Sequence, residues 1–204
     1  MIKRVFFDFD GVLTTDKTGS VTTCKYFSDK LGIDYQELFT KMRKFDEALD
    51  CGEVSENDIW KTICEEVGFE YSPNWLYEAH VITPIDEKMM QYAIQLKDKC
   101  EIGIITDNTI ERVDNIAKKN DWLDDMFDVI IISEDVKSTK KGIKIFEVAA
   151  QRANLSPHEC IFIDNKQANV DSAEKAEFIG VYFDDENRNY EELEKTVSVI
   201  IDEK

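Results

Sequence analysis

The stretch Val5-Phe-Phe-Asp-Phe-Asp-Gly-Val-Leu-Thr14 decides the fold, because a short apolar run ends within it at a carboxylate. The run from Val5 to Asp8 is β-rich and uninterrupted, which is typical of a parallel strand buried on both faces. Asp8 and Asp10 place two carboxyl groups just past this strand, and Gly11 allows a sharp turn there. The stretch therefore predicts a buried strand that delivers acidic side chains to its carboxyl end.

From Thr83 onward, strand and helix patterns alternate along the chain. Helical spacing predicts four helices and a last one that begins at about Tyr190, while apolar runs predict four further strands. The strands are expected at 102–105, 129–132, 160–163 and 179–183, and the helices at 86–99, 109–120, 143–153 and 167–178. This rhythm predicts an α/β fold, a three-layer, Rossmann-like parallel sheet with helices on both faces.

Between about residues 15 and 82 no convincing strand pattern occurs. Apolar residues recur at helical spacing through Leu38 to Leu49, Ser55 has the character of a helix start, and Pro73 favours the opening of another helix. We therefore predict two domains. Residues 1–14 and 83–204 form the α/β core, and residues 15–82 form an all-helical cap inserted after the first strand.

The net negative charge of the chain disfavours two classes of partner, nucleic acids and membranes. Twenty-five basic and 43 acidic residues give a formal net charge of −18. Such an acidic surface repels phosphate backbones and anionic lipids, so we expect no nucleic-acid and no membrane partner. No stretch approaches the length of a membrane span, and the N-terminal apolar run is too short for a signal peptide.

The five cysteines bear on compartment and on metal binding. They are odd in number, scattered, and form no CxxC pair, which argues against a disulfide framework and against a structural zinc site. The consistent interpretation is a reduced, cytoplasmic protein. We expect it to be a monomer or a homodimer.

Polar residues follow four of the predicted strands at the point where each strand ends. In open α/β sheets, ligands bind at this carboxyl edge. Asp8-x-Asp10-Gly11 does not fit a calcium loop, because the glycine comes too early and no closing glutamate follows at the right place. The polar residues are Asp8 and Asp10, then Thr106, Asp107 and Asn108, then Ser133 with Lys140 downstream, then Asp164 and Asn165.

Taken together, these residues resemble the four motifs of the haloacid dehalogenase (HAD) superfamily. The resemblance covers the whole predicted core and implies the strand order 3-2-1-4-5. The helical insert resembles the cap of the subclass that carries it between motifs one and two. The four stretches are Asp8-Phe-Asp-Gly-Val-Leu-Thr14, Ile105-Thr-Asp-Asn108, Ser133-Glu-Asp-Val with Lys140 and Ile145-Phe146, and Ile161-Phe-Ile-Asp-Asn165 with Asn169 and Ala173.

The resemblance implies a role for each site residue. Asp8 would be the nucleophile and Asp10 the general acid and base, with Thr106 and Lys140 as further catalytic groups. Gly11, Asp107 and Asn108 would bind substrate, with the Thr106 hydroxyl and the Asp107 amide holding phosphoryl oxygens. Mg²⁺ would be held by Asp8, by the backbone carbonyl of Asp10 and by Asp164. The implied activity is a Mg²⁺-dependent phosphatase that forms an aspartyl-phosphate and acts on a small phosphorylated metabolite.

Two positions depart from the family pattern. Asn165 stands where a second acidic residue is common, so the rest of the metal shell is open. Lys141 competes with Lys140 as the phosphate-binding lysine, because a proline that often follows the motif lysine is here replaced by Lys141. The spacing to Phe146 favours Lys140.

Other functions compete with the phosphatase. A phosphomutase of the same superfamily would use the same residues and return the phosphoryl group to a sugar. A 2-haloacid dehalogenase is disfavoured, because a departing halide has no use for the proton of Asp10. Non-enzymatic alternatives are a phospho-aspartate receiver-like module, whose acidic residues lie on different strands, and an inactive scaffold.

Overall fold

A parallel sheet of five strands lies at the centre of the protein, in the order β3-β2-β1-β4-β5. The computed structural model describes residues 1–120 and 126–203. The sequence-based strand order 3-2-1-4-5 is therefore confirmed, and the first strand of the chain occupies the middle of the sheet. The strands are β1 (Arg4–Phe7), β2 (Glu101–Thr106), β3 (Val129–Ile132), β4 (Cys160–Asp164) and β5 (Ile179–Tyr182).

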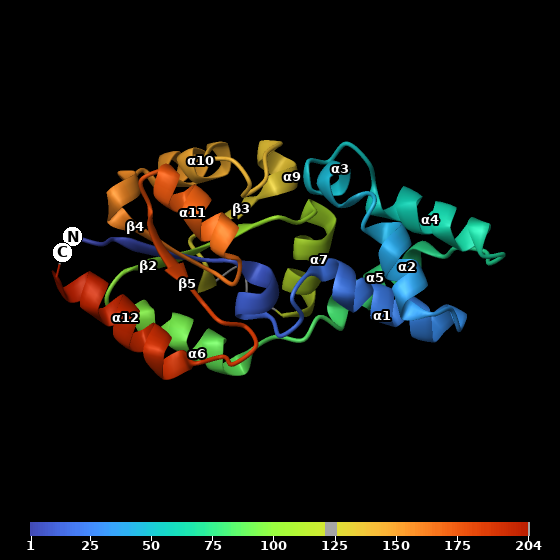
Figure 1. The fold of residues 1–204 in the computed structure, drawn as a ribbon, viewed down its shortest axis with the longest axis horizontal. Coiled ribbons are helices and arrows are strands. Elements are labelled where there is room, and N and C mark those ends of the chain that lie inside the picture. The colour runs from blue at the N-terminus through green and yellow to red at the C-terminus, as the bar shows by residue number, and fades with distance from the viewer. Residues whose placement is uncertain (121–125, 204) are drawn as a thin grey trace.

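Helices cover both faces of this sheet (Figure 1). Val5 and Phe7 pack into one hydrophobic cluster and Phe6 into another, because successive side chains of a strand point to opposite faces. Burial on both faces explains why the strand sequences are continuously apolar. The first cluster includes α6 (Glu87–Leu96), α7 (Ile110–Lys119) and α12 (Tyr190–Glu203), and the second includes α10 (Lys144–Ala153) and α11 (Gln167–Lys175).

Side-chain caps mark where two of the core helices begin, and a residue in the left-handed conformation follows the end of another. The Asp86 carboxylate accepts a hydrogen bond from the backbone N–H of Met89 and caps α6, while the Thr109 hydroxyl caps α7. The helix predicted to reach Phe178 stops at Lys175, and Glu177 then adopts a φ of 66°. Two short elements were not foreseen, α9 (Ser133–Val136) and η2 (Pro157–Glu159). Among the described residues, no helix is long and apolar enough to cross a membrane.

Five helices lie between β1 and α6, and they share a hydrophobic cluster of their own. The ring of Trp60 stacks on Phe27 with 3.8 Å between ring centres. Leu38 to Leu49 do not form one run of helix as their spacing suggests, because the chain turns between Met42 and Asp46 and starts a new helix. The helices are α1 (Gly19–Leu31), α2 (Tyr35–Met42), α3 (Asp46–Asp50), α4 (Glu56–Glu66) and α5 (Pro73–Val81).

The two chain segments that connect this helical part to the sheet run side by side. Thr14 and Ile85 form an isolated antiparallel bridge, and the backbone N–H of Thr15 donates to Pro84 at 2.9 Å. The predicted domain boundaries, at residues 14/15 and 82/83, fall on this paired crossing. The division into two independent domains stays a prediction. Figure 1 shows the helical part, α1 to α5, beyond one end of the sheet.

Candidate active site at the carboxyl edge of the sheet

The turn after β1 sets the position of the first carboxylates. η1 (Phe9–Leu13) is a wide turn, with non-helical backbone at Asp10 and Gly11, that the backbone N–H of Thr14 closes by donating to the Phe9 carbonyl at 3.0 Å. Asp8 precedes it and accepts a hydrogen bond from the backbone N–H of Phe9 at 2.7 Å. Gly11 has a φ of +84°, and a Cβ there would come within 2.2 Å of Asn165 Nδ2. Glycine is therefore favoured at this position by both the backbone conformation and the close approach of the Asn165 side chain, just after β4.

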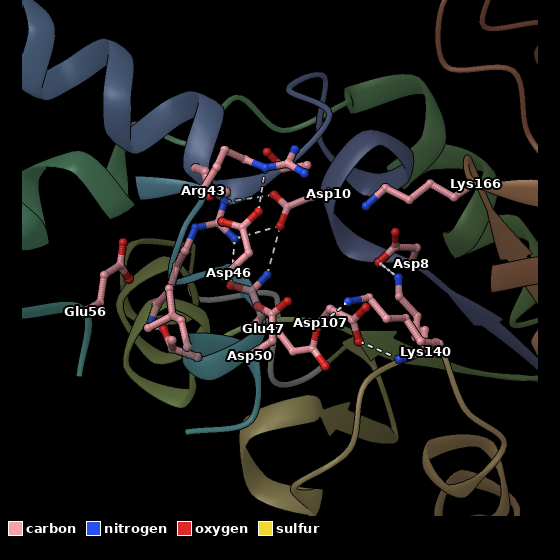
Figure 2. A pocket seen from close by; sticks show the side chains of 18 of the residues that line it. Asp8, Asp10, Arg43, Asp46, Glu47, Asp50, Glu56, Asp107, Lys140 and Lys166 are labelled. Carbon is pink, nitrogen blue, oxygen red and sulfur yellow. Dashed lines mark hydrogen bonds and ion pairs between the residues drawn. The ribbon is translucent and has the colours of Figure 1, made fainter. Parts of the chain in front are cut away.

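Lys140 joins the ends of β1 and β4. Its ammonium lies 2.5 Å from Asp8 Oδ1 and 2.8 Å from Asp164 Oδ2, and all three side chains are almost completely buried. Lys141 points elsewhere, with 68 % of its side chain exposed and an ion pair to Glu47 at 2.9 Å. The structure thus brings Lys140, and not Lys141, to the predicted nucleophile (Figure 2).

The buried charges around Lys140 shift one another's protonation. Burial raises the pKa of Asp8 well above its usual value, and the neighbouring Asp164 raises it further, while Lys140 and Lys166 lower it. Burial alone would lower the pKa of Lys140, but the carboxylates of Asp164, Asp8 and Asp107 outweigh burial, and the pKa is raised. Lys140 therefore carries its charge at neutral pH and offsets the carboxylates beside it.

Asp10 is held by a residue that the sequence did not single out. Arg112 Nη2 donates to Asp10 Oδ1 and Nη1 donates to Oδ2, both at 2.9 Å, and Asn108 Nδ2 donates to Oδ2 at 2.9 Å. Arg112 lies in the first turn of α7, where the helix dipole disfavours a cation. That unfavourable placement, four residues after Asn108, is the only sequence signal that could have pointed to a buried partner.

Hydrogen bonds at the carboxyl end of β2 hold the residues there in place. Thr106 is buried, and its hydroxyl accepts a hydrogen bond from Asn108 Nδ2 at 3.2 Å. The backbone N–H of Asn108 donates to Ser133 Oγ, and the Asp107 carboxylate accepts from the backbone N–H of Lys140 at 2.9 Å. These bonds fix the loop after β2 against the segments that follow β3.

A cavity of about 560 Å³ opens above these residues, between the sheet edge and the helical part. Five of the predicted site residues line it, namely Asp8, Asp10, Asp107, Asn108 and Lys140. The other three lie just outside it: Gly11 follows Asp10 in the chain, Thr106 bonds to Asn108, and Asp164 bonds to Lys140.

The helical part supplies a wall of mixed charge to this cavity (Figure 2). Arg43 pairs with Asp46 at 2.8 Å, and Glu47 reaches across to Lys141. Burial, together with the carboxylates of Asp107 and Asp46, raises the pKa of Asp50 to about 7. None of the wall residues Arg43, Asp46, Glu47 and Asp50 is among the site residues that the sequence predicts.

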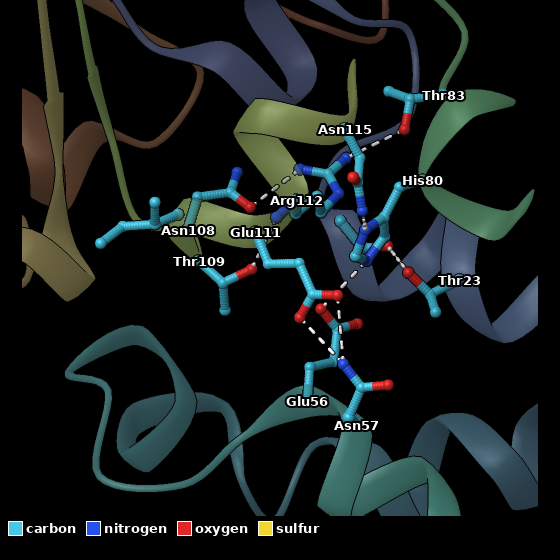
Figure 3. Close-up of polar contacts among 12 residues, drawn as sticks. Thr23, Glu56, Asn57, His80, Thr83, Asn108, Thr109, Glu111, Arg112 and Asn115 are labelled. Atoms are coloured by element: carbon cyan, nitrogen blue, oxygen red, sulfur yellow. Dashed lines mark hydrogen bonds and ion pairs between the residues drawn. The ribbon is translucent and has the colours of Figure 1, made fainter. Parts of the chain in front are cut away.

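Polar contacts also tie the helical part to α7 (Figure 3). The completely buried ring of His80 lies 3.1 Å from Glu56 Oε2 on one side and 3.1 Å from Asn115 Nδ2 on the other. Asn57 Nδ2 donates to the Glu111 carboxylate at 2.9 Å. These contacts hold the wall of the cavity against the core.

The oxygen atoms near the nucleophile bear on whether a divalent cation fits there. Both oxygens of Asp164 are engaged, Oδ2 by Lys140 and Asn169 and Oδ1 by the backbone N–H of Lys166. Asn165 Oδ1, in contrast, is buried and accepts no hydrogen bond from any described residue. A buried acceptor without a donor is costly, and a hard cation that prefers oxygen ligands would satisfy it.

Charged ligands alone do not make a metal site here. Within residues 1–120 and 126–203, no three His, Cys, Asp or Glu side chains gather as a metal-binding group. An amide or backbone oxygen must therefore complete any shell. Asp8, the carbonyl of Asp10 and the unsatisfied amide oxygen of Asn165 are a donor set of the kind that Mg²⁺ accepts.

Solved structures share the fold of this chain. A HAD family enzyme from Bacteroides thetaiotaomicron, in complex with magnesium and inorganic phosphate, matches 90 % of this chain and 94 % of its own, with a TM-score of 0.72 and 19 % identity. L-2-haloacid dehalogenase from Xanthobacter autotrophicus, with chloropropionic acid covalently bound, matches 90 % of this chain and 78 % of its own, with a TM-score of 0.69 and 15 % identity. At these identities the likeness shows the fold alone.

Sequence comparison identifies the family. No curated protein matches the chain closely enough to count as a relative. The family model of haloacid dehalogenase-like hydrolases matches residues 2–177, which covers most of the chain and all four motif-bearing strand ends. The chain therefore belongs to the haloacid dehalogenase-like hydrolases.

Proposed function

We propose that this hydrolase is a Mg²⁺-dependent phosphatase that acts on a small phosphorylated metabolite through an aspartyl-phosphate on Asp8. The observation that carries the proposal is the Lys140 ammonium held between Asp8 and Asp164 at the floor of the cavity. A fixed cation beside a nucleophilic carboxylate lets an anionic phosphoryl group approach it and stabilises the charge that develops during transfer.

The first step is attack of Asp8 on phosphorus. Asp8 Oδ1 is occupied by Lys140 and by the backbone N–H of Phe9, while Oδ2 accepts no hydrogen bond found among the described residues and is left to attack. A bond forms between Oδ2 and phosphorus as the bond to the leaving oxygen breaks, and the leaving oxygen takes up the proton that Asp10 carries as general acid. Lys140 stays beside the oxygen that does not react.

The second step is hydrolysis of the aspartyl-phosphate. The Asp10 carboxylate lines the same cavity and can accept the proton of a water molecule that attacks phosphorus. This step releases inorganic phosphate and restores the Asp8 carboxylate. Bound Mg²⁺, held by Asp8, Asp10 and Asn165 or Asp164, would supply Lewis-acid stabilisation of the phosphoryl charge.

The dimensions of the site favour a small substrate. A cavity of about 560 Å³ lies within the usual range for metabolite-sized ligands. Its cap-side wall carries both signs of charge, from Arg43 and Lys44 on one hand and from Asp46 and Asp50 on the other. Such a wall favours a polar group on the substrate beyond the phosphoryl group.

A second candidate is hydrolysis of a 2-haloacid. The specific observation in its favour is the Arg112–Asp10 pair, because halide leaves without a proton and such chemistry does not need Asp10 as an acid. The same attack by Asp8 would then form an ester to carbon. A phosphomutase would share the first step with the phosphatase and would differ in the acceptor of the phosphoryl group, which would be a sugar and not water.

The test is hydrolysis of p-nitrophenyl phosphate by the wild type and by Asp8→Asn, with Mg²⁺ and with EDTA, beside halide release from 2-chloropropionate. We expect phosphate release that requires Mg²⁺ and falls at least about 10³-fold in Asp8→Asn, because the nucleophile is lost. Equal phosphate release by the variant would exclude the covalent mechanism. Halide release without phosphate release would establish the second candidate instead.

A further inference from the structure

Glu56 brings a buried carboxylate from the helical part to the wall of the cavity. It is the first residue of α4, it lines the cavity, and only 5 % of its side chain is exposed. Oε2 lies 3.1 Å from His80 Nε2, whereas no described residue donates a hydrogen bond to Oε1. Because a buried carboxylate oxygen without a donor is costly, a ligand that donates to Oε1 from the cavity would be bound favourably.

The hydrogen bonds of His80 leave the charge of Glu56 in place. A carboxylate oxygen only accepts, so the Nε2–H of His80 donates to Glu56. On the other side of the ring, Asn115 Nδ2 lies 3.1 Å from Nδ1, and an amide nitrogen only donates, so Nδ1 accepts. An imidazole that donates from one nitrogen and accepts at the other is neutral. His80 therefore orients the Glu56 carboxylate without offsetting its negative charge (Figure 3).

Two carboxylates of α3 add to this side of the cavity (Figure 2). Asp46 Oδ2 pairs with Arg43 Nε at 2.8 Å, but its buried Oδ1 accepts no hydrogen bond from any described residue. Asp50 lies one helical turn further on and also lines the cavity. Its charged form is disfavoured by burial and by the carboxylates of Asp107 and Asp46, which together raise its pKa to about 7. A cation in the cavity would offset this repulsion.

The cationic side chains of the cap-side wall and of the cavity mouth are exposed, unlike that of Glu56. Arg43 and Lys141 have side chains that are 57 % and 68 % exposed, and each is paired with a carboxylate of α3. Lys44 and Lys166 are exposed as well. Water hydrates an exposed cation, whereas a buried carboxylate loses most of its hydration. The cap side of the cavity is therefore better suited to a cation of the ligand than to a second anion.

We propose that the cap side of the cavity is a subsite for a primary ammonium group on the leaving group of the substrate, with the Glu56 carboxylate as its principal acceptor. An ammonium group carries three donors and no acceptor, which matches the carboxylate oxygens without donors on Glu56 and Asp46. The substrates are then phosphate monoesters of amino alcohols. The inference rests on the proposed phosphatase function and names its substrate class.

The experiment compares short ω-aminoalkyl phosphates with the n-alkyl phosphates in which a methyl group replaces the ammonium. We expect kcat/KM of the wild type to be at least about tenfold higher for the best aminoalkyl phosphate than for its alkyl partner, because the methyl group leaves a buried acceptor without a donor. The ω-carboxyalkyl phosphate of the same length should be the poorest of the three, because the carboxylates of the wall repel it. This comparison needs no variant.

Glu56→Gln tests the acceptor with almost no change in shape. It should lower the preference for the aminoalkyl over the alkyl phosphate at least about fivefold, because an amide carries no charge to pair with the ammonium. The matched control is Asp58→Asn, which removes an equal charge from the same first turn of α4 at an exposed position outside the cavity. The control should leave the preference unchanged.

Asn115→Asp tests the role of His80 from outside the cavity wall. A carboxylate in place of the amide would accept a hydrogen bond from Nδ1, so that the imidazole donates from both nitrogens and becomes positively charged. That charge would offset Glu56 and should lower the preference in the same direction as Glu56→Gln. This variant and the wild-type comparison still decide the question if Glu56→Gln folds poorly.

The outcomes separate the inference from the proposed function. Equal kcat/KM values for aminoalkyl and alkyl phosphates in the wild type, or an unchanged preference in Glu56→Gln, would overturn the inference and leave a phosphatase. A preference for carboxyalkyl phosphates, or hydrolysis of p-nitrophenyl phosphate alone, would also overturn it. Absence of hydrolysis of every one of these esters would overturn the proposed function, and the inference with it.

Discussion

At the scale of single residues, the site depends on one ammonium among three carboxylates. Lys140 is buried between Asp8 and Asp164, and its backbone N–H also binds Asp107. Each carboxylate would be costly to bury alone, because an unpaired charge in a protein interior loses its hydration. Lys140 thus serves the stability of the site and the approach of the substrate at once.

Replacing Lys140 should therefore affect catalysis far more than replacing its neighbour. We expect Lys140→Met to lower kcat on p-nitrophenyl phosphate by at least about 10²-fold and to cost about 3–5 kcal/mol of unfolding free energy. Lys141→Met removes only an exposed ion pair with Glu47 and should change stability by less than about 1 kcal/mol. Steady-state kinetics and urea unfolding check both. Comparable losses in the two variants would refute the assignment of Lys140.

Asn165 provides a test of the metal site that does not depend on turnover. Its buried Oδ1 lacks a donor, so the amide is expected to bind the metal, and Asn165→Asp would add a full negative charge there. We expect Asn165→Asp to tighten Mg²⁺ binding at least about tenfold and Asn165→Ala to weaken it. Calorimetric titration with MgCl₂ measures this directly. Unchanged affinity in both variants would place the metal away from Asn165.

At the scale of elements, the turn η1 is fastened by a distant arginine. Arg188 donates to the backbone carbonyls of Gly11, Val12 and Thr14 and pairs with Asp86, the residue that caps α6. Carbonyls that find no partner within the turn need an external donor, because a buried backbone oxygen left without one is costly. Arg188 thereby links the loop that carries Asp10 to the start of α6.

Removal of this link should loosen the site as well as the fold. We expect Arg188→Met to lower the unfolding free energy by about 2–4 kcal/mol and to reduce kcat, because buried carbonyls and the Asp86 carboxylate lose their donor. Urea unfolding and p-nitrophenyl phosphate hydrolysis provide the measurements. Arg152→Met, on the exposed face of α10, serves as the control. A loss below about 0.5 kcal/mol would show that solvent replaces the arginine.

At the scale of the whole molecule, the site exists only where the helical part meets the sheet edge. Asp50 of α3 faces Asp107 of the core, and the carboxylates of Asp107 and Asp46 act with burial to raise the pKa of Asp50 to about 7. Asn57–Glu111 and Glu47–Lys141 join the same two parts by hydrogen bonds and ion pairs. Charged groups therefore hold the cap side to the core at some points, while the carboxylates of Asp50 and Asp107 repel each other at another.

Asp50 should make the stability of the protein fall as pH rises. Its pKa is about 7 when folded against a usual 3.8, so between these values the folded state holds the extra proton. That contribution is favourable at low pH and is lost as pH rises toward 7. We expect Asp50→Asn to be more stable than the wild type at pH 8 by about 1–3 kcal/mol, and less so at pH 5. Urea unfolding at both pH values tests this, with Asp98→Asn as an exposed control.

The strands and the order of the site residues could be predicted from the sequence. Val5 to Asp8 and the later apolar runs need no partner to show that they are buried strands, because burial on both faces makes them uniformly apolar. Where parallel strands lie side by side, their carboxyl ends share one edge, so Asp8, Thr106 and Asp164 had to converge. Local chemistry also marked the helix starts at Asp86 and Pro73.

Only the tertiary structure decided which side chains hold the second carboxylate, that of Asp10. Arg112 lies 102 residues from Asp10, and nothing in the local pattern of α7 requires the two to meet. The unsatisfied amide of Asn165 and the cap wall around Asp50 likewise arise from packing between distant segments. Sequence periodicity reports which side chains are buried, whereas a hydrogen bond depends on the few tenths of an ångström that only the assembled fold determines.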